Sequence, residues 1–403
     1  MTIVFLTLLD ISNVNERGIY HDLLRKFRDE GHKVCVVFPA ERRHKVRTSL
    51  TVQDGISLLR VRTLNIQRTN VVEKGLGTLL LERQYLGEVK KHLSHVQFDL
   101  VLYSTPPITL TKVISYIKKK DKARSYLLLK DIFPQNAVDL GMITTGGALH
   151  RFFLRAEKKL YEVSDFIGCM SPANVQFLLS HNPELDPGKV EVNPNSIEPV
   201  TITISEEERL RVREKYNIPP DAIVLIYGGN LGKPQGIPFL LEVMTSRCAD
   251  ANVYFLIVGS GTESSSVQSW FETECPNNAK LFPGLPKHEY DDLVKACDIG
   301  LIFLDKRFTI PNFPSRLLSY LENKMPVIAA TDRNTDIGKI IEQNNCGFWA
   351  ESGDLKAFND HLDKFVTDRD LVRAMGDNGN KLLKDQYTVG HSYGIIINRL
   401  QDV

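Results

Sequence analysis

Residues 222–258 read Ala222-Ile-Val-Leu-Ile-Tyr227, then Gly-Gly-Asn-Leu-Gly-Lys-Pro-Gln-Gly236, then an amphipathic run through Pro238–Met244, and then Asn252-Val-Tyr-Phe-Leu-Ile-Val258. The first and last runs are short and apolar, which is typical of strands covered on both faces. A strand, a glycine-rich turn, a helix and a second strand make one βαβ unit, and such units build parallel sheets. This stretch therefore predicts a doubly wound α/β fold.

The same alternation runs through the rest of the chain. Further strands are predicted at Ile3–Leu9, Lys33–Phe38, Phe98–Tyr103, Ser125–Leu129, Phe166–Met170, Lys280–Phe282, Ile299–Leu304, Val327–Ala330 and Gly347–Ala350. Helices are predicted at Gly18–Glu30, Leu79–Leu93, Leu110–Lys120, Leu149–Val163, Tyr290–Ala296, Pro314–Glu322, Ile337–Gln343, Leu355–Asp368, Leu371–Gln386 and His391–Leu400. Strict alternation of strand and helix predicts sheets that are parallel throughout.

A linker divides the chain into two such domains. The run Val192-Asn-Pro-Asn-Ser-Ile-Glu-Pro-Val200 is rich in residues that interrupt helices and strands, and the strand–helix pattern then starts afresh. We expect Rossmann-like domains at 1–195 and 196–385, with a C-terminal helix in 386–403 that packs back on the first. Open α/β sheets bind ligands at the carboxyl ends of their strands, so both sheets are expected to face one cleft.

Composition is that of a globular protein, and the cysteines suit a reducing compartment. The chain has 403 residues, 42% of them hydrophobic, which suits two domains. No two of the six cysteines have Cys-x-x-Cys spacing, so we expect reduced thiols and no zinc cage. The apolar start, Met1–Leu9, lacks a basic lead and is expected to be a buried strand, not a signal peptide. No apolar run approaches the roughly 20 residues that span a bilayer, so any membrane contact is expected to be peripheral. Together with the reduced thiols, this predicts a cytoplasmic chain.

Charge is distributed unevenly along the chain. Residues 1–200 carry 28 Lys and Arg against 21 Asp and Glu, whereas residues 201–403 carry 22 against 28. A basic first half favours a polyanionic partner, such as an anionic membrane surface on the inner face of the plasma membrane or a diphosphate-linked lipid. The alternative is that solvated faces differ without function. The run Lys118–Arg124 is read as such a solvated face, with phospholipid contact as the second interpretation, and no nucleic-acid partner is expected.

Two glycine-rich loops in the second domain favour a phosphate-bearing ligand. Tyr227–Gly236 holds more glycine than a turn requires, which allows close approach of a ligand to the backbone, and Lys233 adds charge. Val258-Gly-Ser-Gly-Thr-Glu263 ends a strand of the same sheet, on the same side. The alternative for both loops is a flexible connection without a ligand.

The most specific element is Phe313-Pro-Ser-Arg-Leu-Leu-Ser-Tyr-Leu321. Pro314 suits the first turn of a helix, where its missing N–H costs nothing. The amides of Ser315, Arg316 and Leu317 are then expected to point outward at the positive end of the helix dipole, with the Arg316 guanidinium beside them. This arrangement predicts a seat for a diphosphate. The alternative is a plain capped helix with a surface arginine.

Two positions in the first domain complete the expected site. Gly18 ends the loop after the first strand and precedes a helix, whose N-terminus offers N–H groups to an anion. Asp131 follows the strand Ser125–Leu129, so its carboxylate is expected at the mouth of the cleft, where it orients or deprotonates an acceptor hydroxyl. The alternatives are an ordinary strand–helix turn and a capping aspartate.

Neither a metal nor a cofactor is expected. The ten histidines form no His-Glu-x-x-His grouping, and no Asp-x-Asp pair stands out. The loop before Gly18 lacks the Gly-x-Gly-x-x-Gly fingerprint of dinucleotide-binding enzymes, which argues against an NAD-dependent oxidoreductase.

Taken together, these segments resemble retaining glycosyltransferases of family 4, which have the GT-B fold, and most of all the branch that acts in bacterial capsule and O-antigen assembly. The similarity covers nearly the whole chain. The matching strings are Arg17-Gly18, Gly31-His32-Lys33-Val34, Lys130-Asp-Ile-Phe-Pro134, Gly228-Gly-Asn-Leu-Gly232, Val258-Gly-Ser-Gly261, Pro283-Gly-Leu-Pro286, Ala296-Cys-Asp298 and Pro314–Ala330.

The resemblance implies an acceptor-binding first domain and a nucleotide-sugar-binding second domain. It places a set of residues at the donor: Gly18, Gly229, Asn230, Lys233, Gln235, Gly284, Leu285, Ser315, Arg316 and Leu317. Gly284 and Leu285 would hold the base through the backbone, and the last three residues would hold the phosphates. Asn230 and Gln235 stand where many members carry an Arg and a Lys.

Other positions depart from the family pattern. The paired glutamates of the family are absent, with Pro311 and Ser319 in their places, and Ser104-Thr-Pro-Pro107 replaces a histidine of the catalytic region. The sequence predicts a metal-independent hexosyltransferase that moves a sugar from a nucleotide-sugar, with UDP as the expected nucleotide, to a hydroxyl of a lipid-linked saccharide. A nucleotide-sugar epimerase of the same fold and a non-catalytic nucleotide-sugar-binding partner are the alternatives.

Overall fold

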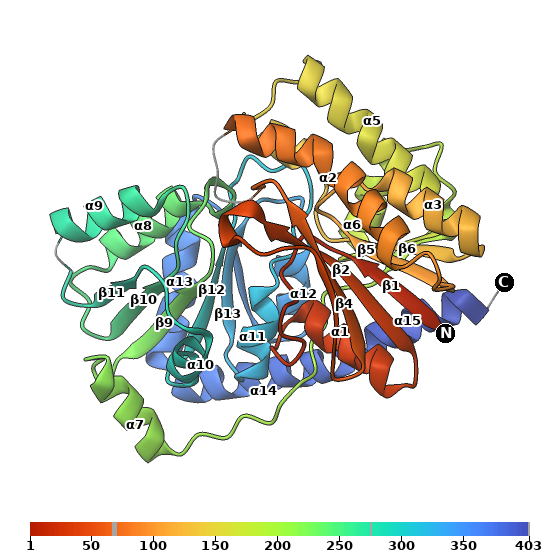
Figure 1. Cartoon of the computed structure of the whole chain (residues 1–403). Coiled ribbons are helices and arrows are strands. Elements are labelled where there is room, and N and C mark those ends of the chain that lie inside the picture. Colours follow the sequence, from red (N-terminus) through yellow and green to blue (C-terminus); the bar gives the residue numbers. More distant parts are fainter. Residues whose placement is uncertain (67–70, 275, 402–403) are drawn as a thin grey trace. The chain divides into compact units, whose positions relative to one another are not determined.

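The chain forms two compact units (Figure 1), and this computed structural model describes residues 1–66, 71–274 and 276–401. One unit consists of Met1–Glu198 with Thr388–Val403, and the other of Pro199–Tyr387. Side chains are described in these ranges except at 71–72 and 74–76; Cys275 lies outside them. No helix of the described ranges is both long and apolar enough to pass through a bilayer. Within the same ranges, His, Cys, Asp and Glu side chains do not gather in threes in a way that would hold a metal ion.

The first unit is built on an eight-stranded sheet with the order β3-β4-β2-β1-β5-β6-β7-β8. Its strands are β1 (Thr2–Leu6), β2 (Lys33–Glu41), β3 (Ser49–Gln53), β4 (Ile56–Thr63), β5 (Leu100–Ser104), β6 (Arg124–Leu129), β7 (Phe166–Cys169) and β8 (Val190–Val192). β1 pairs in parallel with β2 on one side and with β5 on the other. The order of the strands therefore reverses between β1 and β5, and a doubly wound sheet binds its ligand at such a point.

The expectation of strictly parallel sheets is wrong for β3, which pairs antiparallel with β4. The two strands form a hairpin whose turn holds Asp54 and Gly55, with φ of 47° and 81°. Asp-Gly is a strong hairpin signal, because both turn positions require positive φ. β3 is mostly exposed, so it lacks the run of buried residues that indicates a strand. β4, which is mostly buried, and the short β8 were also not predicted from the sequence.

Seven helices cover this sheet in the described residues: α1 (Ile19–Asp29), α2 (Val71–His92), α3 (Thr111–Asp121), α4 (Gln135–Asp139), α5 (Ala148–Val163), α6 (Pro172–His181) and α15 (Val389–Gln401). The C-terminal helix α15 packs against α1, with the Tyr393 ring 5.1 Å from that of Phe27. The Tyr393 hydroxyl also lies 2.9 Å from Nε2 of His32. The end of the chain thus belongs to the core of the first unit.

The second unit has a six-stranded sheet with the order β11-β10-β9-β12-β13-β14, and its paired strands are parallel. The strands are β9 (Ile223–Gly228), β10 (Val253–Val258), β11 (Ala279–Phe282), β12 (Ile299–Phe303), β13 (Val327–Thr331) and β14 (Gly347–Glu351). Here the order reverses between β9 and β12. The loops after these two strands therefore flank the place where a doubly wound sheet binds its ligand.

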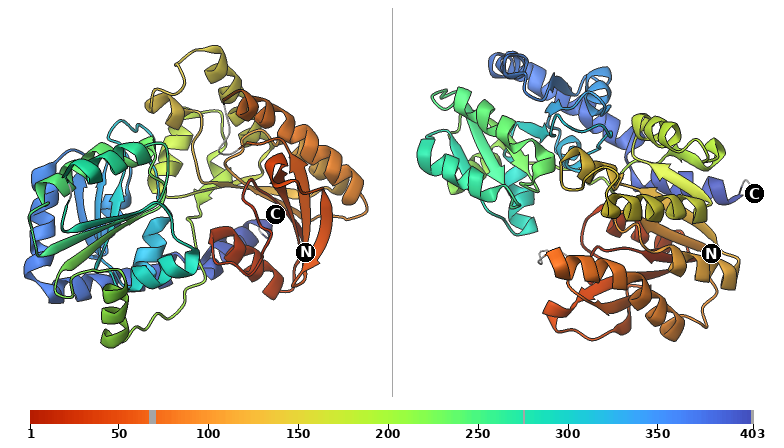
Figure 2. Two further views of the ribbon diagram at one scale, coloured as in Figure 1. Left: turned by 60° about the vertical axis from the view of Figure 1, so that its left-hand side comes forward. Right: turned by 90° about the horizontal axis from the view of Figure 1, so that it is seen from above.

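Helices lie on both faces of this second sheet (Figure 2). They are α7 (Glu206–Lys215), α8 (Ile237–Ser246), α9 (Ser264–Glu274), α10 (Lys287–Lys295), α11 (Arg316–Glu322), α12 (Ile337–Gln343), α13 (Leu355–Thr367) and α14 (Arg369–Gln386). Sheets of this kind, repeated in two Rossmann-like units, confirm the predicted fold class.

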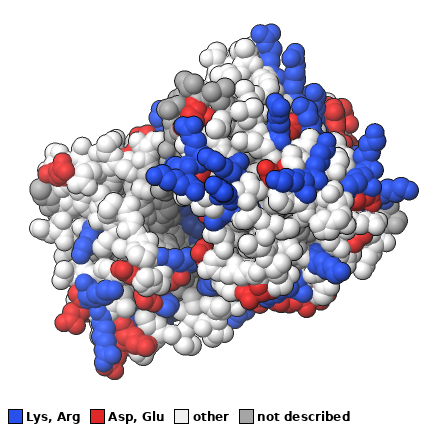
Figure 3. Space-filling model, in the orientation of Figure 1, with Lys and Arg blue, Asp and Glu red and all other residues white. Residues whose placement is uncertain are grey.

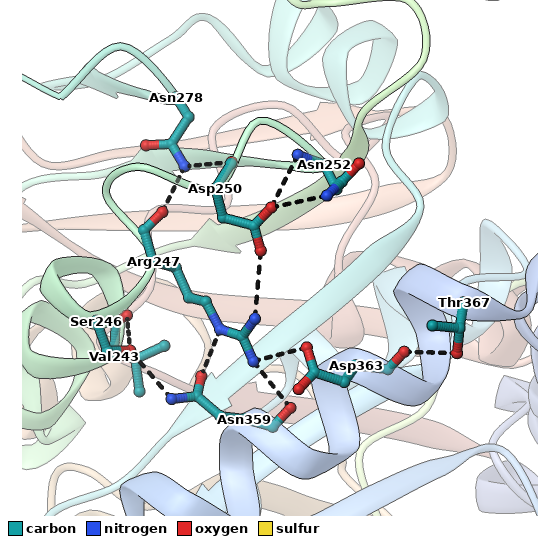
Figure 4. Close-up of polar contacts among 9 residues, drawn as sticks. All are labelled: Val243, Ser246, Arg247, Asp250, Asn252, Asn278, Asn359, Asp363 and Thr367. Atoms are coloured by element: carbon teal, nitrogen blue, oxygen red, sulfur yellow. Dashed lines mark hydrogen bonds and ion pairs between the residues drawn. The ribbon is translucent and has the colours of Figure 1, made fainter.

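Arg247 fixes the edge of the sheet opposite the ligand-binding edge (Figure 4). It follows α8 and precedes β10, and its Nε donates to Oδ1 of Asn359 at 2.9 Å. Its Nη2 pairs with Asp363 at 2.7 Å, and its Nη1 with Asp250 at 3.2 Å. One side chain thereby joins the end of α8 to α13.

Candidate functional site

The loops after β9 and β10 interlock at the ligand-binding edge of the second sheet. A Cβ on Gly259 would lie 1.8 Å from the carbonyl oxygen of Gly229, and one on Gly261 would lie 2.3 Å from that of Leu231. The Leu231 N–H donates to the Ser260 carbonyl at 3.0 Å. Gly229 itself has a φ of 133°, which only glycine adopts without strain. The glycines of both motifs are therefore required for backbone to approach backbone.

Replacing Gly259 with alanine is expected to lower the stability of the second unit and to weaken binding of any ligand at this edge. The new methyl group would meet backbone atoms, which cannot move aside as a flexible side chain does, and overpacking of this kind costs about 1–3 kcal/mol. Urea unfolding measures the loss. Gly284→Ala is the matched control, because no heavy atom lies within 4 Å of its added Cβ. Equal stability of the two variants would contradict the claim that Gly259 is required for the two loops to approach each other.

Arg316 lies beside this loop with one donor group unused. Its Nη2 donates to Oε1 of Gln235 at 2.6 Å, and its guanidinium carbon lies 4.3 Å from the centre of the Tyr227 ring. Its Nη1 is buried and has no hydrogen-bond partner in the described part of the chain. A Cβ on Gly229 would lie 3.3 Å from Nη2. A buried cationic donor without a partner is costly, and an anionic ligand would satisfy it.

The helix that contains Arg316 starts later in the sequence than predicted. α11 begins at Arg316 and not at Pro314, and Ser315 caps it without a side-chain hydrogen bond. The N–H of Leu317 donates to the Pro314 carbonyl at 3.2 Å, so that amide is not free for a phosphate, and the Leu317 side chain is buried. The Arg316 side chain, more than the exposed amides, is what this turn offers to an anion.

The remaining predicted donor residues lie around this centre at the same edge of the sheet. Asn230 and Lys233 are exposed in the loop after β9, and Gly284 and Leu285 follow β11. Sequence reasoning missed Tyr290 of α10: a Cβ on Gly228 would lie 2.0 Å from its hydroxyl, so the two are in direct contact.

It also missed Tyr320 of α11, whose hydroxyl accepts from the Gly228 N–H at 3.3 Å. Tyrosines of two helices thus support the loop that carries Gly229. The only signal in the sequence for these two tyrosines is Gly228, the small residue that both of their side chains contact.

In the first unit, Gly18 precedes α1 next to the point where the strand order reverses. Its N–H donates to Oδ1 of Asp22 at 3.1 Å, so this amide is already occupied. His21, in the first turn of the helix, is 6% exposed, and neither of its ring nitrogens has a partner among the described residues. Burial lowers the pKa of this imidazole, which favours its neutral form.

Asp131 lies at the end of β6, in the same unit as Gly18. Its N–H donates to Oγ1 of Thr105 at 3.0 Å, and its Oδ1 accepts from Nδ2 of Asn136 at 2.6 Å. Burial raises the pKa of the Asp131 carboxyl to about 6. Desolvation also lowers the pKa of the neighbouring, half-buried Lys130 to about 7, and its Nζ donates to the Asn193 carbonyl at 3.1 Å. A carboxylate with a pKa near neutrality is typical of functional sites.

Glu157 of α5 is a second buried carboxyl of the first unit. It is 6% exposed and its Oε1 accepts from the Tyr161 hydroxyl at 2.7 Å. Burial raises its pKa from 4.5 to about 7. The folded chain therefore holds this proton more tightly than the unfolded chain, so the stabilisation is complete below pH 4.5 and is lost as the pH rises through about 7.

We expect Glu157→Gln to remove this loss of stability. Relative to wild type, the variant gains about 3 kcal/mol in free energy of unfolding between pH 4.5 and pH 8, because its amide does not ionise. Urea unfolding at a series of pH values measures the difference. Glu162→Gln, at an exposed position of the same helix, is the control. A difference that stays constant with pH would refute the assignment to Glu157.

Comparisons with known proteins agree with this architecture. Residues 208–382 match the family model of glycosyl transferases group 1. Over 386 residues, covering 94% of this chain and 92% of the relative, the chain is 22% identical to the probable glycosyltransferase WbjE of Pseudomonas aeruginosa. Over 186 residues, 44% of this chain and 46% of the relative, it is 27% identical to the capsular polysaccharide biosynthesis glycosyltransferase CapM of Staphylococcus aureus.

Solved structures show the same fold. Anabaena Alr3699/HepE, solved in complex with UDP and glucose, superposes with a TM-score of 0.72 at 14% identity, over the whole of both chains. The comparisons indicate a glycosyltransferase: residues 208–382 match the model of glycosyl transferases group 1, within a chain that has the GT-B fold.

Proposed function

We propose that the chain transfers a sugar, with retention, from a UDP-sugar to a hydroxyl of a lipid-linked saccharide, at the cytoplasmic face of the membrane, in the synthesis of a surface polysaccharide. The observation that carries the proposal is the unused Nη1 of Arg316 at the point where the second sheet reverses its strand order. The similarity to the glycosyltransferases WbjE and CapM supports the reaction class, and the UDP bound to HepE supports the donor.

In the proposed reaction, the second unit must stabilise a departing diphosphate. As the bond between the sugar and the diphosphate breaks, negative charge grows on the phosphate oxygens, and a fixed cation stabilises that charge more than it stabilises the intact donor. Arg316 is held by Gln235 and by the Tyr227 ring, so it needs no reorganisation. Of the other predicted donor residues, Lys233 adds charge, and Gly229, Asn230 and Ser315 line the same loops.

On the acceptor side, we assign Asp131 to orienting the attacking hydroxyl. Its ionised carboxylate accepts a hydrogen bond from that hydroxyl, and a phosphate oxygen of the leaving diphosphate takes the proton as the new glycosidic bond forms. No protein nucleophile and no metal ion are needed in this scheme. The first domain, 1–195, would bind the acceptor and the second, 196–385, the donor. Gly18, Gly284 and Leu285 are proposed as further contacts of the donor.

Thermal-shift measurements with UDP-, GDP- and dTDP-sugars test the donor assignment, because a ligand that binds only the folded chain raises its melting temperature. We expect UDP-sugars to give the largest rise, and release of free UDP only when a lipid-linked saccharide is added. Conversion of the donor sugar without an acceptor would indicate an epimerase. Donor binding with no turnover on any acceptor would indicate a non-catalytic partner.

A further inference from the structure

The start of α5 and the loop before it expose large apolar side chains within a short stretch of the chain. Met142 and Leu149 are each 64% exposed, and Phe152 is 41% exposed. Leu149 and Phe152 are three residues apart on the helix and so are neighbours on its surface. Met142 lies in the loop 141–147, which is itself mostly exposed. Clusters of this kind mark interaction sites more often than scattered single residues do.

The same helix carries an exposed row of cations. Arg151, Arg155 and Lys159 recur every four residues and all three are exposed. None of them has an ion-pair partner in the ranges that the structure describes, whereas their neighbour Lys158 pairs with Glu184 at 2.8 Å. The opposite side of the helix is buried through Glu157, Leu160 and Tyr161. α5 thus shows solvent a face that is apolar at its start and cationic along its length.

Neighbouring helices extend the positive charge. α3 packs against both α2 and α5, so the three helices form one layer. Together they contain twelve Lys and Arg against six Asp and Glu. Lys and Arg side chains gather on the part of the surface where these helices lie (Figure 3). This layer accounts for most of the positive charge of the first half of the chain.

We infer that the 142–159 surface, defined as Met142, Leu149, Phe152, Arg151, Arg155 and Lys159, docks on an anionic lipid bilayer. Apolar side chains flanked by unpaired cations are what an interfacial helix needs: the former enter the boundary between headgroups and acyl chains, and the latter contact anionic headgroups. An acidic protein surface would satisfy the cations but would leave Met142 and Leu149 with less to gain. The combination of exposed apolar side chains with cations therefore favours lipid.

This inference deepens the proposed function and rests on it in one respect, since a lipid-linked acceptor gives docking its purpose. Bound at α5, the first unit would stand at the membrane surface from which such an acceptor projects. The docking itself is a property of the 142–159 surface alone, so it is measurable without donor, acceptor or turnover.

Co-sedimentation of the full chain with vesicles tests the inference. We expect binding to vesicles of equal parts phosphatidylglycerol and phosphatidylcholine, little binding to phosphatidylcholine alone, and weaker binding as salt screens the cations. The double variant Leu149→Ser/Phe152→Ser should lower the partition coefficient about tenfold or more. The triple variant Arg151→Gln/Arg155→Gln/Lys159→Gln should lower it about fivefold per cation at low salt.

Matched controls carry the same changes elsewhere. Val52→Ser/Leu210→Ser removes exposed apolar side chains from β3 and α7, and Arg373→Gln/Lys381→Gln/Lys384→Gln removes three exposed cations from α14. Both controls should bind vesicles as the wild type does. All changed residues are exposed, so circular dichroism is expected to show native folding throughout.

Three results would overturn the inference. The α5 variants could bind vesicles as tightly as the wild type does, or the wild type could bind independently of phosphatidylglycerol and salt. The wild type could also bind no vesicles and instead self-associate, with the Leu149→Ser/Phe152→Ser variant remaining monomeric. Affinity for UDP-sugar, measured on the same samples, separates the two proposals. Lost vesicle binding with intact donor affinity in the α5 variants supports the lipid surface. If the wild type binds vesicles but no nucleotide-sugar, the proposed function is refuted, whereas the inference that the 142–159 surface docks on lipid is not.

Discussion

Arg316→Ala is expected to weaken nucleotide-sugar binding by about 2 kcal/mol or more, which is roughly a 30-fold rise in Kd. The reason is that Nη1 of Arg316 is a buried cationic donor without a partner, and a phosphate oxygen is the ligand that would satisfy it. The loss in kcat should be larger than the loss in affinity, because the diphosphate gains charge as it departs. Titration calorimetry measures the first effect and steady-state kinetics the second.

Arg307→Ala is the matched control for this prediction. Arg307 lies on the same loop before α11, but both its Nε and its Nη2 donate to the carboxylate of Asp305, at 2.9 and 2.6 Å. Because that guanidinium already has an anionic partner, its removal should leave donor affinity within about twofold of wild type, as for other surface ion pairs. Equal losses in the two variants would mean that general positive charge, not the position of Arg316, governs binding.

Asp131→Asn should retain donor affinity and lose at least about a hundredfold in kcat, the usual contribution of a positioned acid–base group. The asparagine keeps the oxygen that accepts from Asn136, so the local hydrogen bonds survive. In the wild type, kcat/KM should be constant at high pH and fall below a pH near 6, where the carboxylate whose pKa burial has raised becomes protonated. The variant should lack this decline.

Asp139→Asn, in α4 of the same unit, controls for a general loss of charge. It should show wild-type turnover and the wild-type pH profile. Undiminished turnover in Asp131→Asn would mean that Asp131 only stabilises the turn after β6 and does not act on the acceptor.

Most buried strands were predictable from the sequence, but β3, β8 and the mostly buried β4 were not. β9 and β10 are buried at every position, so continuous apolar runs indicated them within a residue or two. β3 is an exposed edge strand, and β8 spans only Val190–Val192, so neither shows a run of buried residues. The start of α11 was set too early, because Pro314 takes part in the turn before the helix and not in its first position.

The candidate site could be predicted where one side chain carries the chemistry, and not where packing does. Arg316 stood out as a cation after a turn-forming proline. The sequence gives no reason, however, to place the hydroxyl of Tyr290 against Gly228, because that contact depends on how α10 packs on the sheet. The occupied amides of Gly18 and Leu317 depend in the same way on local geometry.

A crystal structure of the chain with bound UDP tests the central claim most directly. The account predicts a phosphate oxygen at hydrogen-bonding distance, about 3 Å, from Nη1 of Arg316, with Gln235 still on Nη2. A diphosphate held elsewhere, with Nη1 of Arg316 still buried and unpartnered, would contradict it.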